Sequence, residues 1–138
     1  MDIDDLDTPV PVVDLDRLDA NVVRLQAYLS KHGLANRPHI KTHKIPAIAH
    51  LQIKAGAVGI TCQKLGEAEV MADAGIRNIF IPYNIIGDSK LDRLMQLGQR
   101  STLSVATDSA KVARGLSDAA SAAGQTLAVL VECDKSAS

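Results

Sequence analysis

The chain has little aromatic content, with one Phe, two Tyr and no Trp among its 138 residues. Since 46% of the residues are hydrophobic, the core is expected to consist of Val, Ile, Leu and Ala side chains. Aliphatic cores of this kind are typical of parallel sheets, whose strands are buried on both faces. A charged content of 22% places the chain among globular proteins rather than disordered or membrane-spanning ones. A single globular domain is therefore expected.

An excess of charge of one sign is also missing, since 15 basic and 16 acidic residues give a formal net charge of −1. The basic residues are scattered, which disfavours binding to nucleic acid or to an anionic membrane surface. No apolar run reaches the roughly 18 residues that a membrane-spanning helix needs. The N-terminus, Met1 to Asp5, is acidic and lacks the pattern of a secretory signal. These absences predict a cytoplasmic protein with neither a nucleic-acid nor a membrane partner.

Sequence motifs for metals and for phosphate groups are absent as well. The two cysteines, Cys62 and Cys133, show no CxxC or Cys/His ligand spacing, so no metal ligands are assigned. Two buried free thiols are expected, with a disulfide as the alternative. Neither GxGxxG nor GxxxxGKS/T occurs, which excludes the common glycine-rich loops for dinucleotides and nucleoside triphosphates.

Hydrophobic periodicity indicates strands that alternate with helices along the chain. Helices are expected at residues 16 to 32, 45 to 55, 65 to 74, 88 to 98 and 108 to 123. After an extended segment at 10 to 13, strands are expected at 38 to 41, 58 to 62, 79 to 81, 103 to 106 and 127 to 133. The apolar stripe of the first helix comprises Leu18, Val22, Leu25 and Leu29. Candidate caps of the last two helices are Asp88 or Ser89 and Asp108 or Ser109.

This order of elements predicts right-handed βαβ units and a parallel sheet, because short loops join each helix to its strands. Two α/β architectures remain open. A complete (β/α)8 TIM barrel takes about 250 residues, so five strands starting at residue 38 would form only part of one. An open doubly wound sheet suits the length better, but its first strand-to-helix turn is normally glycine-rich. Here that turn reads Lys41-Thr42-His43-Lys44-Ile45-Pro46.

Basic and imidazole side chains gather in one segment, Arg37 to Lys44. If residues 38 to 41 form a strand, His39 and Lys41 point to one face, and Lys41 stands at the carboxyl end of the strand. Ligands bind at this end of the strands in α/β sheets. A lysine that is partly desolvated there can lose its proton and attack a carbonyl group to form a Schiff base. The alternative is that Lys41 and Lys44 only solvate a loop.

Three segments carry a resemblance to a known family. They are Thr8-Pro9 to Asp14-Leu15, then Arg37-Pro38-His39-Ile40-Lys41-Thr42-His43-Lys44, then Gly59-Ile60-Thr61-Cys62-Gln63-Lys64-Leu65-Gly66-Glu67-Ala68-Glu69. In order and spacing they resemble the start of the D-threonine aldolase and D-serine dehydratase group, relatives of alanine racemase. The resemblance covers nearly the whole chain. It implies a partial (β/α)8 barrel of the alanine racemase N-terminal type, truncated after about five strands.

In the family that this chain resembles, the first lysine of the Pro-His-x-Lys-Thr-His-Lys element binds pyridoxal 5'-phosphate covalently, and Lys41 occupies that position. The cofactor acts as an electron sink. The resemblance therefore implies a lyase that cleaves a small D-β-hydroxy amino acid to glycine and an aldehyde, as D-threonine aldolase does. A dehydrating ammonia-lyase like D-serine dehydratase is an alternative. A non-catalytic pyridoxal-phosphate-binding protein and an inert truncated remnant also remain open.

Further site candidates surround this lysine. His39 is a candidate to bind beside the cofactor, with a packed strand histidine as the alternative, while Thr42 and His43 are expected in loop or helix-cap positions. The substrate-pocket candidates follow the next two strands and are Gln63, Lys64, Tyr83 and Asn84. Their alternative role is loop solvation or capping. Glu67 and Glu69 are expected on a solvated helix face.

The end of the sequence departs from the family. After Val129 to Asp134 the family continues into a glycine-rich turn with an arginine, whereas this chain reads Lys135-Ser136-Ala137-Ser138. We therefore expect residues 1–138 to be the N-terminal part of a pyridoxal-phosphate-binding barrel, without the rest of the barrel and the C-terminal β-rich domain. A divalent metal is expected only in a full-length member, because that domain carries the family's metal site. Unpaired strand edges predict a marginal chain that associates, with a homo-oligomer as one outcome.

Overall fold

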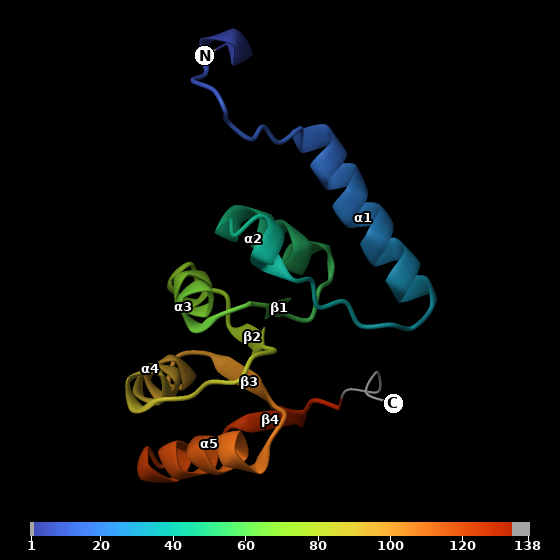
Figure 1. Ribbon diagram of the computed structural model, residues 1–138. Helices are drawn as coiled ribbons and strands as arrows, with labels where there is room; N and C mark the ends of the chain where they lie inside the picture. Colours follow the sequence, from blue (N-terminus) through green and yellow to red (C-terminus); the bar gives the residue numbers. More distant parts are fainter. Residues whose placement is uncertain (1, 134–138) are drawn as a thin grey trace, which may run out of the picture.

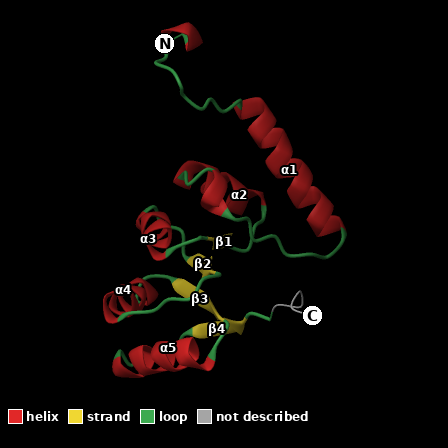
Figure 2. Cartoon of the chain, in the orientation of Figure 1, coloured by secondary structure: helices red, strands yellow, loops and turns green. Residues whose placement is uncertain are grey.

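The computed structural model describes residues 2–133, in which helices and strands alternate (Figure 1; Figure 2). The helices are α1 (Leu15–Lys31), α2 (Pro46–Ala55), α3 (Leu65–Asp73), α4 (Asp88–Gly98) and α5 (Ala110–Ala122). The strands are β1 (Ile60–Thr61), β2 (Asn78–Ile81), β3 (Thr102–Thr107) and β4 (Ala128–Val131). Two 3-10 turns lie at Ile3–Asp5 and Ile40–Thr42. Lys135 to Ser138, for which a departure from the family pattern is predicted, lie outside the described residues.

The four strands form a parallel sheet in the order β1-β2-β3-β4, with Ile60 opposite Ile79 and Val105 opposite Val129. Right-handed crossovers that advance in one direction place every connecting helix on the same face. Figure 1 shows α3, α4 and α5 stacked along one side of the strands. A doubly wound sheet has helices on both faces. The fold is therefore α/β and part of a (β/α)8 barrel, as predicted.

The core lies between the sheet and its helices, and it is aliphatic as predicted. Alternate residues of β2 are buried against the helices, and Phe80, the single Phe of the chain, is half-buried on the opposite face. Each fully buried Leu or Ile side chain contributes about 1.5–3 kcal/mol relative to an exposed one. The largest of these side chains are Ile40, Ile60, Met71, Ile76, Ile79, Ile81, Leu94, Leu97 and Leu116.

The prediction of a strand at residues 38 to 41 is wrong. Only His39 pairs with the sheet, through a single parallel bridge to Thr61, and the chain then enters the 3-10 turn. The imidazole of His39 causes this turn locally, because its Nδ1 accepts the backbone N–H of Lys41. The Ile40 carbonyl next accepts the N–H groups of His43 and Lys44. Four strands plus this one bridge therefore occupy the five strand positions that the sequence predicted.

Helix α1 lies apart from the sheet and packs along α2 (Figure 1). Its half-buried stripe differs from the predicted one, because Leu25 is 51% exposed and Gln26 replaces it. Gln26 lies four residues after Val22 on the same helical row, and its Oε1 accepts a hydrogen bond from Asn36. Asp14 caps the helix by accepting the N–H of Arg17 at 3.0 Å.

Of the two predicted helix caps, that of α5 is confirmed and that of α4 is wrong. Ser109 caps α5 by accepting the backbone N–H of Val112, as expected. The cap of α4 is Gly87 rather than Asp88 or Ser89, and its φ of +94° suits a residue without a Cβ.

The last strand is an open edge. Val129, Leu130 and Val131 of β4 are all more than 40% exposed, although their sequence is that of a buried strand. Apolar surface of this kind is normally covered by a neighbouring element. Cys133, just beyond it, is exposed and free, so the expectation of two buried thiols holds only for Cys62.

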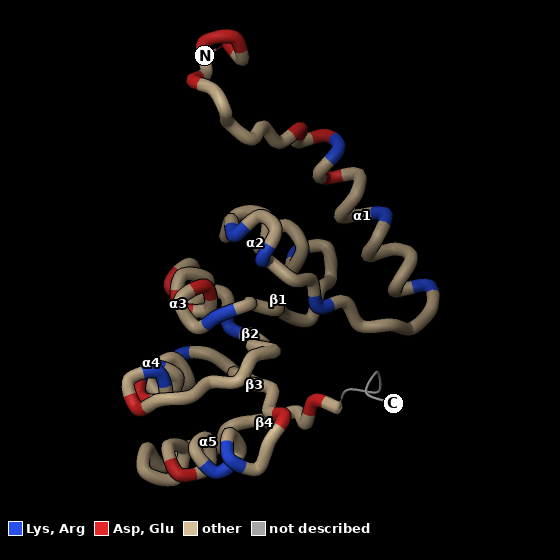
Figure 3. Tube along the Cα trace, viewed as in Figure 1, with Lys and Arg blue, Asp and Glu red and all other residues tan. Residues whose placement is uncertain are grey.

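Charges of both signs are mixed along the chain beyond the acidic N-terminal residues (Figure 3). Among residues 2–133, no helix has the length and hydropathy that crossing a bilayer requires.

Candidate functional site

Parallel strands bring their carboxyl ends to one edge of a sheet, and in barrel enzymes this edge carries the active site. The loops that follow His39, β1, β2 and β3 all lie on this edge. The residues singled out from the sequence, which are Lys41, Gln63, Lys64, Tyr83 and Asn84, belong to these loops and turns. The fold therefore gathers them at the edge where ligands bind.

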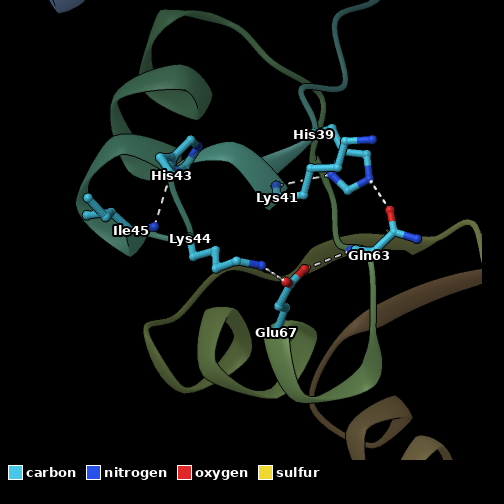
Figure 4. Close-up of polar contacts among 7 residues, drawn as sticks. All are labelled: His39, Lys41, His43, Lys44, Ile45, Gln63 and Glu67. Atoms are coloured by element: carbon cyan, nitrogen blue, oxygen red, sulfur yellow. Dashed lines mark hydrogen bonds and ion pairs between the residues drawn. The ribbon is translucent and has the colours of Figure 1, made fainter. Parts of the chain in front are cut away.

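Lys41 is the second residue of the 3-10 turn, and its side chain is exposed. Its backbone N–H donates to His39 Nδ1 at 3.2 Å. Within residues 2–133, its amine forms neither a hydrogen bond nor an ion pair. Figure 4 shows Lys41, His39 and Gln63 on one side of the loop and His43 on the other. The turn thus fixes the backbone of Lys41 and leaves its amine accessible.

His39 has both ring nitrogens engaged. Because Nδ1 accepts the N–H of Lys41, the ring proton of the neutral form is on Nε2, which lies 3.2 Å from Gln63 Oε1 and donates to it. The imidazole thus connects the cofactor-lysine candidate to the loop after β1. His39 and Gln63 are in direct contact even though 24 positions separate them in the sequence.

Glu67 is the residue that the sequence placed wrongly. Its side chain is only 7% exposed, whereas a solvated helix face was expected. Its Oε2 accepts the backbone N–H of Gln63 at 2.9 Å, and its Oε1 accepts from Lys44 Nζ (Figure 4). Glu67 is the third residue of α3, where a glutamate commonly reaches back to the chain before the helix. That helix-start position is the signal in the sequence that could have identified it.

Burial and the interaction partners of Glu67 shift its pKa in opposite directions. Burial by itself would raise the pKa of the carboxyl, but the hydrogen bonds from Lys44 and Gln63 and the charges of Lys44 and Lys64 bring the pKa below its ordinary value. Glu67 is therefore a buried carboxylate that stays ionised at neutral pH. The neighbouring thiol responds to the same charge, since burial and then Glu67 raise the pKa of Cys62 to about 12. Cys62 is accordingly an unreactive thiol.

His43 follows the expectation of a cap. It is the C-cap residue of the 3-10 turn, and its Nδ1 accepts the backbone N–H of Ile45 at 3.0 Å. Burial is the main cause that lowers the pKa of His43. Thr42 is the last residue of the same turn. Glu69 is half-buried and pairs with Arg93 of the neighbouring helix α4.

A cavity of about 410 Å³ opens beside this cluster, between the loops after β1 and β2. All four substrate-pocket candidates from the sequence line it, together with basic side chains of α4. Gln63 is shared between this cavity and the contact with His39, whereas His39 and Lys41 do not line it. Its lining consists of Gln63, Lys64, Leu65, Gly66, Ile81, Tyr83, Asn84, Ile85, Lys90 and Arg93.

Asn84 has a partner that the sequence did not suggest. Its Nδ2 donates to Asp108 Oδ2 at 2.6 Å, and the backbone N–H of Asp108 donates to its Oδ1 at 3.3 Å. This two-way contact joins the loops after β2 and β3. Tyr83, the neighbouring candidate, is 54% exposed. Across residues 2–133, no group of three or more His, Cys, Asp or Glu side chains is arranged to hold a metal ion.

The chain is similar to a known domain family and to enzymes that contain it. Residues 13–138 match the family model described as alanine racemase, N-terminal domain. The chain is 43% identical over 129 residues to a D-threonine aldolase of Arthrobacter sp, covering 94% of this chain and 34% of that protein. It is 35% identical over 130 residues to the D-threo-3-hydroxyaspartate dehydratase of Delftia sp. (strain HT23), again covering 94% and 34%.

The crystal structure of D-threonine aldolase from Filomicrobium marinum is similar in fold, with a TM-score of 0.92 and 45% identity. The match covers 96% of this chain and 36% of that one. The chain thus spans about a third of the length of the relatives that it matches. Because the family model covers all but the first residues of the chain, this chain belongs to the alanine racemase N-terminal domain family.

Proposed function

We propose that this chain forms the cofactor-binding part of a pyridoxal-phosphate-dependent lyase that cleaves D-β-hydroxy amino acids to glycine and an aldehyde. The observation that carries the proposal is the position of Lys41, whose amine is exposed on a fixed turn at the carboxyl edge of the sheet. The lysine lies in a chain that is 43% and 45% identical to two D-threonine aldolases. The position of Lys41 supports the cofactor, and the higher identity to the aldolases than to the dehydratase supports retro-aldol cleavage as the reaction.

The residues around Lys41 fit pyridoxal phosphate. The cofactor needs a primary amine free of competing partners, and Lys41 Nζ has none within residues 2–133. His39 and Gln63 flank this lysine and are already hydrogen-bonded to each other. When bound, the cofactor withdraws electrons from the substrate bond that breaks. We assign Lys41 and His39 to hold it.

His39 is best suited to packing rather than to proton transfer. Its Nδ1 accepts from Lys41 N–H, and its Nε2 proton is donated to Gln63, so both nitrogens are engaged within the protein. A general base needs a free lone pair within reach of the proton that it removes. We therefore do not assign His39 as the group that accepts the β-hydroxyl proton of the substrate, and propose that it provides a fixed surface beside the cofactor.

The substrate side of the site is assigned to the cavity between the loops after β1 and β2. Gln63, Lys64 and Tyr83 line it with accessible polar atoms. These residues would contact the amino acid while Lys41 holds the cofactor. Asn84 also lines the cavity, but its amide is occupied by Asp108.

A dehydrating ammonia-lyase is the second candidate, because the dehydratase of Delftia is 35% identical over 94% of this chain. Dehydration removes the proton of Cα and releases the β-hydroxyl group, whereas cleavage breaks the bond between Cα and Cβ. Both reactions would use Lys41 in the same role. Product analysis separates them, since only cleavage yields glycine from D-threonine.

The experiment begins with the full-length protein and pyridoxal phosphate. An absorbance scan before and after borohydride reduction, followed by peptide mapping, should place one modified lysine per chain at Lys41. Lys41→Ala should remove the visible absorbance band and all lyase activity, because the amine is the covalent attachment point. Labelling of several lysines without preference, or a band that survives Lys41→Ala, contradicts the proposal. D-threonine and D-serine are then assayed for glycine and ammonia release.

A further inference from the structure

A closed series of contacts surrounds the cofactor-lysine candidate. His39 connects Lys41 to Gln63, and the backbone N–H of Gln63 donates to Glu67. Glu67 in turn accepts from Lys44, three residues after Lys41 (Figure 4). The segment from His39 to Lys44 is therefore attached at one end to Gln63, in the loop after β1, and at the other to Glu67, in the first turn of α3, with Lys41 between the two attachments. The amine of Lys41 is the part of this arrangement that remains free.

The attachment at Lys44 has an energetic basis. Lys44 has a φ of +56°, the one positive value outside glycine among the described residues. Its backbone N–H donates to the Ile40 carbonyl at 2.7 Å in this conformation. A lysine adopts the left-handed region only when its surroundings hold it there. Two contacts restrain Lys44 in this conformation: its backbone hydrogen bond to Ile40, and the ion pair of its side chain with Glu67, whose buried carboxylate needs a charged partner.

We propose that Glu67 is a positioning residue for Lys41, which acts by binding Lys44 and the backbone of Gln63 so that the segment from His39 to Lys44 keeps the conformation that presents the amine to the cofactor. This inference rests on the proposed role of Lys41 and extends it to a residue that touches neither cofactor nor substrate. A helix-start contact alone would explain the hydrogen bond to Gln63. It does not explain the pairing with Lys44, which comes from a different loop.

The chain offers a matched control for the loss of an ion pair. Glu69 lies two residues after Glu67 on the same helix and pairs with Arg93, with an Arg93 Nε to Glu69 Oε1 distance of 2.8 Å. That pair joins α3 to α4 and does not contact the segment from His39 to Lys44. Glu69→Gln therefore removes a charge from α3 without removing the attachment.

The test compares Glu67→Gln, Lys44→Met, Lys44→Arg and Glu69→Gln in the full-length protein. Amide hydrogen exchange of the peptide covering residues 39 to 44 measures the backbone order of the apo-protein. Pyridoxal phosphate titration followed by absorbance, with borohydride mapping, measures cofactor affinity and the modified lysine. Lys44 is 57% exposed, so its variants should fold even if Glu67→Gln does not.

We expect Glu67→Gln and Lys44→Met to speed exchange in residues 39 to 44 and to weaken cofactor affinity about tenfold or more, as small misplacements of a reacting group do. Lys44→Arg keeps the pairing and should bind the cofactor more tightly than Lys44→Met. Glu69→Gln should match the wild type in both measurements. Unchanged exchange and affinity in Lys44→Met overturn the role of Glu67. If Lys41 is not modified in the wild type, the proposed function fails first, which the mapping shows separately.

Discussion

Polar side chains connect neighbouring segments both at the amino ends of the strands, the amino edge, and at their carboxyl ends, the carboxyl edge. These contacts have different consequences at the two edges. At the amino end of the strands, Arg37 donates to Asn78 Oδ1 at 3.0 Å and to the Ile60 carbonyl at 3.5 Å. Gly59 is packed against the same group, since a Cβ there would lie 2.5 Å from both Arg37 and the Asn78 carbonyl. These contacts hold the segment before His39 to the starts of β1 and β2.

The carboxyl edge is tied by Glu67, which joins two loops through Lys44 and the backbone of Gln63. Here the contacts end beside an exposed amine, that of Lys41. Barrel enzymes separate stability from chemistry in this way, with the amino face serving the fold and the carboxyl face the reaction. Similar polar contacts therefore hold strands together at the amino edge and, in our proposal, orient the Lys41 amine at the carboxyl edge.

The largest loss of stability is expected from Gly59→Ala, at the amino edge. The added methyl would meet the Asn78 carbonyl of the adjacent strand, which cannot move without disturbing the pairing of β1 with β2. Overpacking of this kind lowers the free energy of unfolding by about 3 kcal/mol. Urea unfolding of the full-length protein measures it. Gly66→Ala is the control, because a Cβ there meets nothing within 4 Å and α3 gains a better helix former.

If Gly59→Ala unfolds at the same urea concentration as Gly66→Ala, the backbone at the amino edge can shift to accommodate the added methyl group, and the predicted loss of stability is contradicted. The modification of Lys41 by pyridoxal phosphate, counted per folded molecule, should be the same in Gly59→Ala as in the wild type. A loss of labelling without a loss of stability would mean that the two edges are coupled.

A smaller, pH-dependent effect is expected at the carboxyl edge. The pKa of Glu67 is below its ordinary value of about 4.5 in the folded protein, so the ionised form stabilises the fold. This contribution is fully present above the unfolded pKa and is lost as the pH falls through the folded pKa. The difference in unfolding free energy between the wild type and Glu67→Gln should therefore be constant from pH 6 to 8, at about 1–2 kcal/mol.

Below about pH 4.5 the same difference should shrink, because the wild-type carboxyl becomes protonated and loses its ion pair. Urea unfolding at a series of pH values measures the trend. Glu69→Gln serves as the reference, since it also removes a carboxylate of α3 from an ion pair, but one that contacts neither Lys44 nor Gln63. A difference that grows on acidification would show that burial, and not the contact with Lys44, dominates the pKa of Glu67.

The comparison of the edges also shows what the sequence could predict. Periodicity located all five helices and the four strands β1 to β4, although β1 is shorter than the predicted 58 to 62, because these elements depend on apolar patterns that repeat locally. The segment at 38 to 41 failed because the side chain of His39 binds the backbone two residues later, which ends the strand after one bridge. Propensity does not register such a contact.

Site residues were predicted in the same uneven way. The four pocket candidates do line one cavity, since their positions after strands follow from the parallel topology. Their roles in binding stay predictions. Glu67 was misjudged because a charged residue on a helix normally faces water, and only the fold brings Lys44 close enough to hold it inside. Long-range partners of this kind cannot be derived from spacing in one sequence.

The smallest effect is expected at the contact between Asn84 and Asp108, which also lies at the carboxyl edge but away from Lys41. Both side chains are at least partly exposed, so Asn84→Ala and Asp108→Ala should each lower the free energy of unfolding by about 0.5–1 kcal/mol. If the contact only joins two loops, the double variant loses no more than either single one, and the KM for D-threonine changes equally in both. A KM that rises in Asn84→Ala but not in Asp108→Ala would assign Asn84 to the substrate. In that case Asn84 would both join two loops and bind the substrate. The carboxyl edge would then differ from the amino edge in a second residue that serves binding as well as stability.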